Sequence, residues 1–350
     1  RGDFSTAAPT LPSGIGILGR SRDWLASYLS ERSQMVAHGG MVSDVVSCDT
    51  GVPQGSRLGP VLFVLFINDI EEIGLLGSLY MYADDLCLLY RGRSTEGLQG
   101  DAARDLGRIE GWARRSKVTI NAAKTKYMAF GFDGGDLHLC LGTARLESVK
   151  EFRYLGVILD VSLSFTSHIN CLVGKLSALT GAMRRAAKDE TGIETRMMIY
   201  RSLFESIMNY AALVWSSASK EDLKRVQVAQ NKFLRVILRL DKYCPSEDIY
   251  KDREIVKISN AVNAHKISHI YKIVNDLTHS NFILTKRTNV QNTRRANLFE
   301  IVKPHTTKYG IRGLRYSSTK LFNEFMQENP QINFNNLKLK INEFVQNTIV

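Results

Sequence analysis

The tetrapeptide Tyr82-Ala83-Asp84-Asp85 lies between two short apolar runs and constrains the fold of this chain more than any other segment. Both runs are rich in apolar and aromatic residues and contain no proline, which predicts two strands joined by a tight turn. Two adjacent carboxylates repel each other at such a turn, and a divalent cation with oxygen ligands relieves that repulsion. Aspartate is also an ordinary turn residue, so the tetrapeptide by itself leaves a metal site and a plain hairpin both open.

A loop rich in glycine and proline, residues 51–60, leads into an apolar segment. Pro60 would lie in the first turn of a helix, where its missing N–H costs nothing. Residues 61–67 are apolar on every side, so we expect this helix to be buried and to end near Gly74. Gln54 carries a donor and an acceptor that can contact the edge of a base or a sugar. A packed helix with a flexible entry explains residues 61–67 equally well, but it does not explain Gln54.

Taken together, these segments resemble the reverse transcriptases of non-LTR retrotransposons, and jockey-like elements in particular. The resemblance covers five blocks in the family's order, which span residues 24–160. The blocks are Trp24 to Gln34, the 51–60 loop with Phe63 and Ile67-Asn68-Asp69, the 82–85 turn, Trp112 with Asn121-Ala122-Ala123-Lys124-Thr125-Lys126, and Tyr154 to Asp160. A weaker resemblance continues through Tyr210, Trp215 and residues 230–235. The chain is identified as a member of this family and is expected to be N-terminally truncated, without the fingers and the upstream endonuclease.

The resemblance implies a polymerase palm that holds two Mg²⁺ ions, with Mn²⁺ as the alternative, between three aspartates. Asp84 and Asp85 correspond to two of the three, and Asp84 is the ligand expected to be indispensable. The ions would activate the primer 3′-hydroxyl and hold the triphosphate of the incoming deoxynucleotide. Asp3 would be the third metal ligand, because it opens a five-residue match to the family's first palm block. Ala8 and Pro9 depart from that block, so a chance match at Asp3 stays open.

The resemblance also implies substrate contacts near the expected metal site. Pro53, Gln54 and Gly55 would lie against the incoming nucleotide and the template. Tyr82 would border the primer end. These four residues and the metal ligands come from separate parts of the chain, so a folded palm is needed to bring them together.

Two later blocks supply further candidates. Lys124 or Lys126 falls where the family places a cation near the leaving pyrophosphate, which would make it a general acid. A solvated loop lysine is the alternative at that position. Phe152, Tyr154 and Gly156 would belong to a hairpin that supports the primer. An ordinary buried strand explains the apolar members of that hairpin equally well.

The composition agrees with an intracellular protein that binds nucleic acid. The five cysteines are scattered without a Cys-x-x-Cys pair, which predicts reduced thiols and a nuclear or cytoplasmic location. No signal peptide and no apolar stretch of membrane-spanning length is visible. The net charge is +11, and it is uneven: residues 1–100 contain 7 Lys or Arg against 11 Asp or Glu, and residues 101–350 contain 39 against 24. An acidic catalytic part beside a basic, duplex-binding part fits this division, and so does a mildly basic solvated surface.

Hydrophobic periodicity predicts an α+β fold in three parts. Residues 1–160 would form a partial reverse transcriptase palm, an antiparallel sheet with helices. Residues 161–242 would form a helical thumb-like region, and residues 243–350 a mixed, mostly helical C-terminal region. The expected helices span residues 24–30, 98–115, 168–188, 194–215, 220–240, 252–277, 317–326 and 335–345. Strands are expected at residues 41–49, 118–120 and 127–132.

Two functions follow from this reading. The first is an RNA-directed DNA polymerase that takes an RNA template, a DNA primer and deoxynucleoside triphosphates, although we expect the chain itself to be weak or inactive. The second is a catalytically inactive remnant that only binds a nucleic-acid duplex. A host protein that uses the palm for protein contacts is a third reading, and it predicts an occluded 84–85 turn. The oligomeric state is left open.

Overall fold

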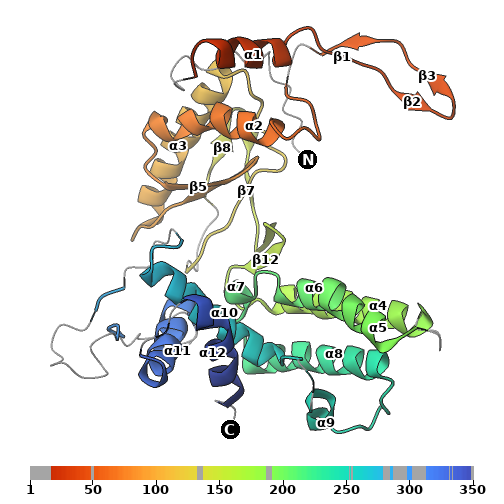
Figure 1. Ribbon diagram of the computed structural model, residues 1–350. Helices are drawn as coiled ribbons and strands as arrows, with labels where there is room; N and C mark the ends of the chain where they lie inside the picture. Colours follow the sequence, from red (N-terminus) through yellow and green to blue (C-terminus); the bar gives the residue numbers. More distant parts are fainter. Residues whose placement is uncertain are drawn as a thin grey trace. The chain divides into compact units, whose positions relative to one another are not determined.

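The computed structural model describes residues 17–48, 51–131, 137–186, 191–251, 253, 255–278, 284–286, 298–301, 313–330, 332 and 334–347. The chain divides into two compact units, Arg1–Val149 and Lys150–Val350, and each has its own hydrophobic clusters (Figure 1). The described part of the first unit combines helices with small sheets, and that of the second is mostly helical. The predicted α+β class is therefore confirmed.

The helices of the first unit are α1 (Arg20–Leu29), α2 (Gly59–Ile67) and α3 (Thr95–Arg115), and a 3₁₀ helix, η1 (Asn68–Ile73), continues α2. Gly74 ends η1 in the left-handed region with φ +71°, as the sequence predicts. The Ser94 hydroxyl accepts a hydrogen bond from the Gly97 N–H at 3.2 Å and caps the N-terminus of α3.

The expectation that α2 is buried on every side is wrong. Leu62 packs against α1, and Ile67 packs against α3 and the 78–89 hairpin, but Val61 and Val64 are each 54% exposed. A helix that is apolar all round needs partners on every side to be buried. In the described part of the unit, α2 has such partners on two sides.

The strands of the first unit form only two-stranded sheets in the described residues. The antiparallel pairs are β1 (Ser33–Gln34) with β4 (Val46–Ser47), β2 (Ala37–His38) with β3 (Met41–Val42), β5 (Ser78–Tyr82) with β6 (Asp85–Leu89), and β8 (Cys140–Leu141) with β9 (Ala144–Arg145). The fifth pair is parallel, β7 (Lys126–Tyr127) with β10 (Glu147–Ser148). The strand expected at residues 41–49 is thus split between β3 and β4, which belong to an exposed arm (Figure 1). Residues 118–120 form no strand, because they enter the turn that follows α3 and pack on the core as irregular chain.

The second unit opens with a hairpin of β11 (Glu151–Tyr154) and β12 (Val157–Asp160). Its helical elements are α4 (Thr166–Ala186), α5 (Ile193–Ile199), the π-helix η2 (Tyr200–Glu205), α6 (Ser206–Asn209), α7 (Ala212–Trp215), α8 (Lys220–Leu238), α9 (Ser246–Tyr250), α10 (Ile258–Val274), α11 (Leu314–Glu328) and α12 (Phe334–Asn347). The helix expected at residues 194–215 is interrupted, because η2 widens one turn and Ala211 adopts φ +50° between α6 and α7.

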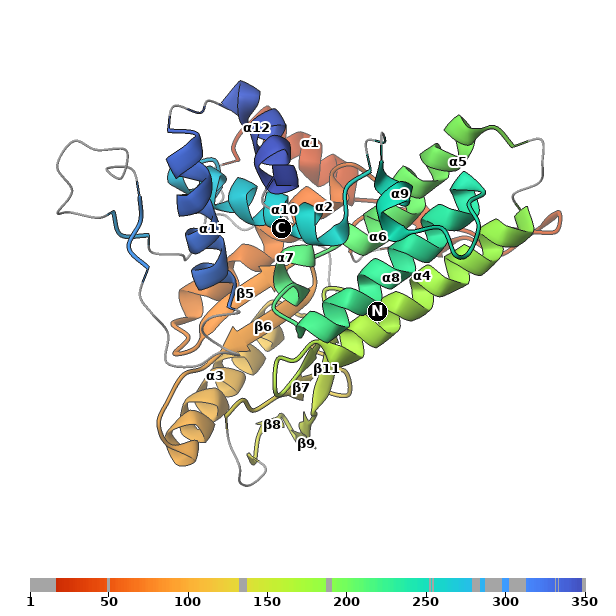
Figure 2. The ribbon, with the colours of Figure 1, turned by 90° about the horizontal axis from the view of Figure 1, so that it is seen from below.

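Two hydrophobic clusters hold the second unit together. In the first, α4 lies along α8 (Figure 2), and the fully buried residues Leu176, Phe204, Trp215 and Phe233 pack between the helices. In the second, α10, α11 and α12 pack around Phe325. No helix among the described residues combines the length and the apolar character needed to cross a membrane.

Candidate active site

The predicted hairpin at residues 82–85 is present. The register pairs Tyr82 with Asp85, so Ala83 and Asp84 form a two-residue turn between β5 and β6. Ala83 adopts φ +52°, in the left-handed region that glycine or asparagine usually occupies. Both carboxylates of the turn are exposed. The chain thus folds so that two adjacent acids stand in solvent at the tip of a short ribbon.

The two faces of this hairpin differ. Leu79, Met81 and Leu86 point toward the core that α3 and η1 build. Successive side chains of a strand alternate between faces, which places Tyr80 and Tyr82 on the opposite side, where Tyr82 is 68% exposed. The packed face fixes the ribbon, and the open face carries its tyrosines beside the acids.

The structure brings together two of the three expected metal ligands. Asp3 lies outside the described residues, so its role is untested. No group of three His, Cys, Asp or Glu side chains that could hold a metal ion occurs among the residues that are described. Asp69, in the second block of the resemblance, instead accepts a hydrogen bond from Trp112 Nε1 at 2.9 Å and joins η1 to α3.

The 51–60 loop folds around Ser56, a residue that the sequence reading did not single out. Its hydroxyl donates to the Pro53 carbonyl at 2.9 Å and accepts from the Gly59 N–H at the same distance. Gly59 has no room for a side chain, since a Cβ there would lie 3.0 Å from Ser56 Oγ. Gly55 turns the chain with φ +80°, and Gln54 is exposed beside it. The loop is therefore rigidly connected to the start of α2, and its amide side chain reaches solvent.

The lysine block forms a tight turn that separates its two lysines. The backbone N–H of Lys124 donates to Asn121 Oδ1 at 3.1 Å, and Thr125 Oγ1 donates to the Asn121 carbonyl at 2.9 Å. Lys126 forms an ion pair with Glu147 at 2.5 Å across β7 and β10. Lys124 is exposed, so it is the more accessible of the two candidate cations.

Tyr154 and Gly156 lie in the β11–β12 hairpin, which belongs to the second unit. Leu155 and Gly156 form its turn with φ +44° and +80°, which is the type I′ geometry. The Tyr210 hydroxyl donates to the Leu155 carbonyl at 2.8 Å, and a Cβ at Gly156 would lie 3.1 Å from the Tyr210 ring. The turn thus packs against Tyr210 and is held there by a hydrogen bond.

Asp160, at the end of the last block, has a structural role that the sequence did not reveal. Its buried carboxylate accepts hydrogen bonds from Ser162 (N–H 3.0 Å, hydroxyl 2.5 Å), Ser164 (N–H 3.1 Å, hydroxyl 3.0 Å) and the Phe165 N–H at 2.8 Å. Burial raises the pKa of this carboxyl, but the hydrogen bonds from Ser162, Ser164 and Phe165 outweigh that effect and lower the pKa to about 2. Asp160 therefore stays ionised and organises the approach to α4.

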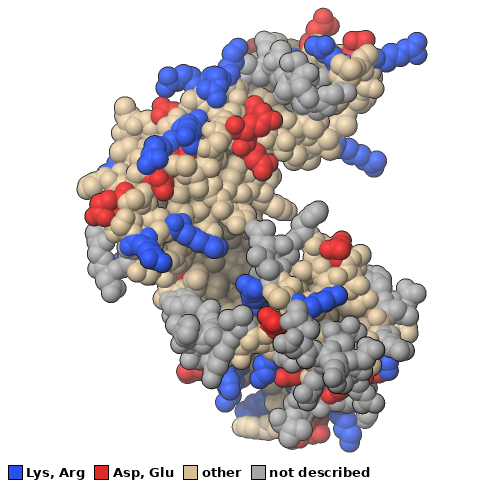
Figure 3. Space-filling view, turned by 90° about the vertical axis from the view of Figure 1, so that its left-hand side faces the viewer, with Lys and Arg blue, Asp and Glu red and all other residues tan. Residues whose placement is uncertain are grey.

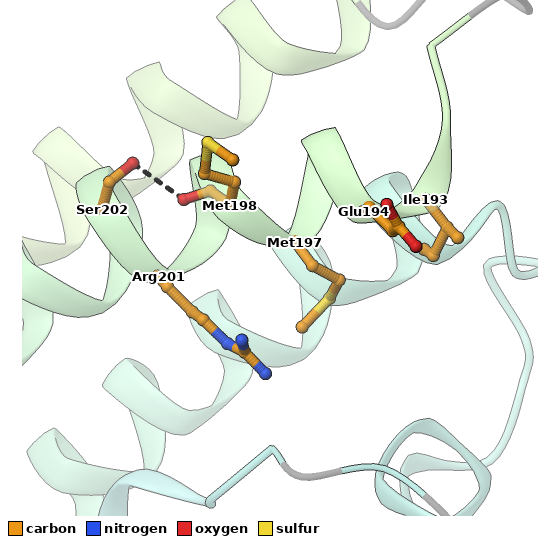
Figure 4. Close-up of a pocket in the computed structure, with 6 residues that line it drawn as sticks. All are labelled: Ile193, Glu194, Met197, Met198, Arg201 and Ser202. Atoms are coloured by element: carbon orange, nitrogen blue, oxygen red, sulfur yellow. Dashed lines mark hydrogen bonds between the residues drawn. The ribbon is translucent and has the colours of Figure 1, made fainter.

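A pocket on α5 and η2 contains none of the predicted site residues. It is lined by Ile193, Glu194, Met197, Met198, Arg201 and Ser202 (Figure 4). Its walls are mainly apolar and include a single carboxylate, so this pocket does not offer the paired acids that a two-metal site needs.

The surface charge is dispersed. On the face shown in Figure 3, Lys and Arg side chains are scattered over the described residues instead of gathering in one patch. Among the described residues on that face, the basic side chains therefore form no single anion-binding centre.

Comparisons with known proteins show which family the chain resembles. Residues 14–159 match the family "Reverse transcriptase (RNA-dependent DNA polymerase)". The chain is 27% identical over 252 residues to a probable RNA-directed DNA polymerase from the X-element transposon of Drosophila melanogaster. The aligned region covers 69% of this chain and 27% of that protein. It is 29% identical over 252 residues to the RNA-directed DNA polymerase from the mobile element jockey of Drosophila funebris, with 68% and 27% covered.

The matched region includes the 51–60 loop, the 82–85 turn and the lysine block. The chain spans about a quarter of the length of these two relatives. These matches show that residues 14–159 belong to a reverse transcriptase domain of the kind found in non-LTR retrotransposons such as jockey and the X-element.

Proposed function

We propose that the chain is part of an RNA-directed DNA polymerase, and that Asp84 and Asp85 hold the metal ions of nucleotidyl transfer. The observation that carries this proposal is the β5–β6 hairpin, which presents two adjacent carboxylates to solvent while its other face is packed on the core. Carboxylate oxygens are the ligands that Mg²⁺ prefers, so the donor set fits the metal that this family uses. When bound, the ions would stabilise charge on the attacking and leaving oxygens.

The other predicted residues have roles that their positions support. Gln54 is exposed on a loop fixed by Ser56, so it can contact the template or the incoming nucleotide without moving the loop. Tyr82 is beside Asp85 on the open face and would border the primer end. Lys124 is accessible and would donate a proton to the leaving pyrophosphate.

In this proposal, residues 1–160 form the palm part of the polymerase, residues 161–242 the thumb, and residues 243–350 a C-terminal extension. The partners are an RNA template, a DNA primer and deoxynucleoside triphosphates. The pairing of α4 with α8 supports a thumb of long helices. The described part of the chain itself does not cover the 84–85 turn.

Primer extension on an RNA template with Mg²⁺ tests the proposal. Asp84→Asn and Asp85→Asn should each abolish extension, whereas Asp44→Asn, an exposed acid on the β1–β4 arm, should not change it. Asp84→Asn should leave stability unchanged or increase it, because the change removes repulsion between neighbouring charges. Full activity in Asp84→Asn would refute the metal role.

A second candidate function is duplex binding without chemistry. It is favoured by one observation, that the described residues supply only two clustered acids. Wild-type chain that binds a primer–template with a steep salt dependence but does not extend the primer would establish this function in place of polymerisation. If the affinity for primer–template did not change with salt, the basic region would have no part in binding under either function.

A further inference from the structure

Asp105 on α3 is fully buried and contacts the two chain segments that enter and leave the β5–β6 hairpin at its base. Its Oδ2 accepts hydrogen bonds from the Leu76 N–H at 2.9 Å, the Gly77 N–H at 2.9 Å and the Tyr90 hydroxyl at 3.1 Å. Leu76 and Gly77 come just before β5, and Tyr90 comes just after β6. One carboxylate therefore ties together the two chain segments at the base of the hairpin.

The charge of this carboxylate is compensated from the same helix. Arg108, one turn further along α3, lies 3.5 Å from Asp105 Oδ1 and donates a hydrogen bond to the Gly74 carbonyl. A buried carboxylate is costly unless hydrogen bonds and a counter-charge satisfy it. Burial, reinforced by the Asp105 charge, raises the pKa of the Tyr90 hydroxyl, so that hydroxyl keeps its proton and remains a donor.

A steric contact reinforces the hydrogen bonds. A Cβ at Gly77 would lie 2.6 Å from the Tyr90 ring, so the ring closes over a position that only glycine can occupy. Asp105 and the Tyr90 ring thus both contact Gly77, which directly precedes Ser78 in the first residue pair of the ribbon. The tip, with Asp84, is at the far end of the same ribbon.

The geometry points to Asp105 as the positioning residue for the acids at the hairpin tip. A strand of five residues spans about 16 Å, so a rotation of roughly 5° at the base moves the tip by about 1.4 Å. Mg²⁺ tolerates little such movement, because it demands near-octahedral ligands at about 2.0–2.1 Å. Asp105 itself touches neither substrate nor metal. Its link to the metal ions rests on the proposed polymerase function, but its effect on the hairpin does not.

Hydrogen exchange of the backbone amides tests the positioning without requiring activity. Asp105→Asn replaces acceptor Oδ2 or Oδ1 by an NH₂ group that faces N–H donors. Loss of hydrogen bonds to a buried charge should speed exchange roughly tenfold or more throughout residues 78–89. Glu110→Gln, which removes a half-buried charge from the same helix, is the matched control and should leave the hairpin unchanged. Faster exchange confined to Leu76 and Gly77, or no change at all, would overturn the inference.

If Asp105→Asn does not fold, Tyr90→Phe answers the same question. It removes one hydrogen bond from Asp105 and keeps the ring over Gly77. We expect a smaller increase in exchange over the same residues. Exchange at the wild-type rate in this variant would contradict the positioning role.

Primer extension then shows whether Asp105→Asn disturbs the position of the acids at the tip or only lowers the stability of the fold. Asp105→Asn should raise the half-saturating Mg²⁺ concentration several-fold while the Kd for primer–template stays unchanged. A lower Tm with an unaltered Mg²⁺ requirement would overturn the link to the metal site. If the wild-type chain does not extend a primer, the proposed function fails, and the exchange experiment still decides whether Asp105 holds the hairpin.

Discussion

Tyr82 lies directly opposite Asp85 in the antiparallel register of β5 and β6, so the phenol and the carboxylate share the exposed face of the hairpin. Opposite residues of such a pair have Cβ atoms about 5 Å apart. A large ring is therefore fixed next to one of the two acids, on the side that the core leaves open. In the proposed function, this is the arrangement that the primer end would meet at the tip of the hairpin.

The backbone of Ala83 predicts an effect on stability. Its φ of +52° costs a residue with a Cβ about 1 kcal/mol, and a β-branched residue more. Ala83→Gly should be close to neutral, because relief of strain offsets the greater freedom of glycine in the unfolded chain. Ala83→Val should be destabilised by roughly 2 kcal/mol relative to Ala83→Gly. Urea denaturation measures the difference, and equal stabilities would show that the turn is not strained.

A substitution at Gly156 in the second unit should also lower stability, because it adds a steric contact to the strained backbone. Gly156→Ala combines φ +80° with a Cβ that would lie 3.1 Å from the Tyr210 ring. We expect a loss of about 1–2 kcal/mol in the free energy of unfolding. Gly174→Ala, at an open and exposed site within α4, is the control and should be neutral or stabilising. Wild-type stability in Gly156→Ala would mean that Tyr210 moves aside without cost.

Asp160 predicts how stability changes in acid. Its folded pKa of about 2 lies below the ordinary value of 3.8, so its contribution is present above pH 4 and is lost as the pH falls toward 2. The contribution is on the order of 2 kcal/mol. Asp160→Asn should lower stability at pH 6 and show a shallower decline between pH 4 and pH 2. An identical decline in the variant and the wild type, measured by urea unfolding at each pH, would contradict this assignment.

His168 predicts a pH effect closer to neutrality. Its Nδ1 accepts a hydrogen bond from the Ile158 N–H at 3.3 Å, and burial, followed by Lys175 and Arg153, lowers its pKa. The unfolded chain therefore takes up a proton first as the pH falls below 6.5, and stability decreases from that point downward.

His168→Gln should remove this part of the decline, whereas His138→Gln, at an exposed position, should keep it. The pKa values of His265 and His269 are also lowered, so these two residues contribute to the same loss of stability in acid. The difference between His168→Gln and the wild type gives the contribution of His168 alone. A decline that persists in His168→Gln at full size would show that the imidazole is not held neutral.

The sequence predicted the elements that local patterns determine. Two short apolar runs on either side of the 82–85 turn predicted the hairpin, and helical spacing from Ala102 to Trp112 predicted α3. Most helices of the second unit also lie close to their expected ranges. In these segments the period of the apolar residues matches the element that forms.

Contacts between distant residues were not predictable in this way. The sequence analysis did not single out Asp105, whose buried carboxylate accepts hydrogen bonds from backbone amides 28 and 29 residues away. Val61 and Val64 looked like core residues, yet no described element covers them. Both outcomes depend on which elements pack together, and a local pattern carries no information on that.

Incorporation of a single complementary deoxynucleotide onto a DNA primer annealed to RNA tests the central claim most directly. With Mg²⁺ present, we predict at most weak incorporation by the wild-type chain, and none by Asp84→Asn. Equal incorporation by both proteins would contradict the account, because the hairpin acids would then not hold the catalytic metal ions. No incorporation by either would overturn polymerisation by this chain and would leave duplex binding as the function that it can perform.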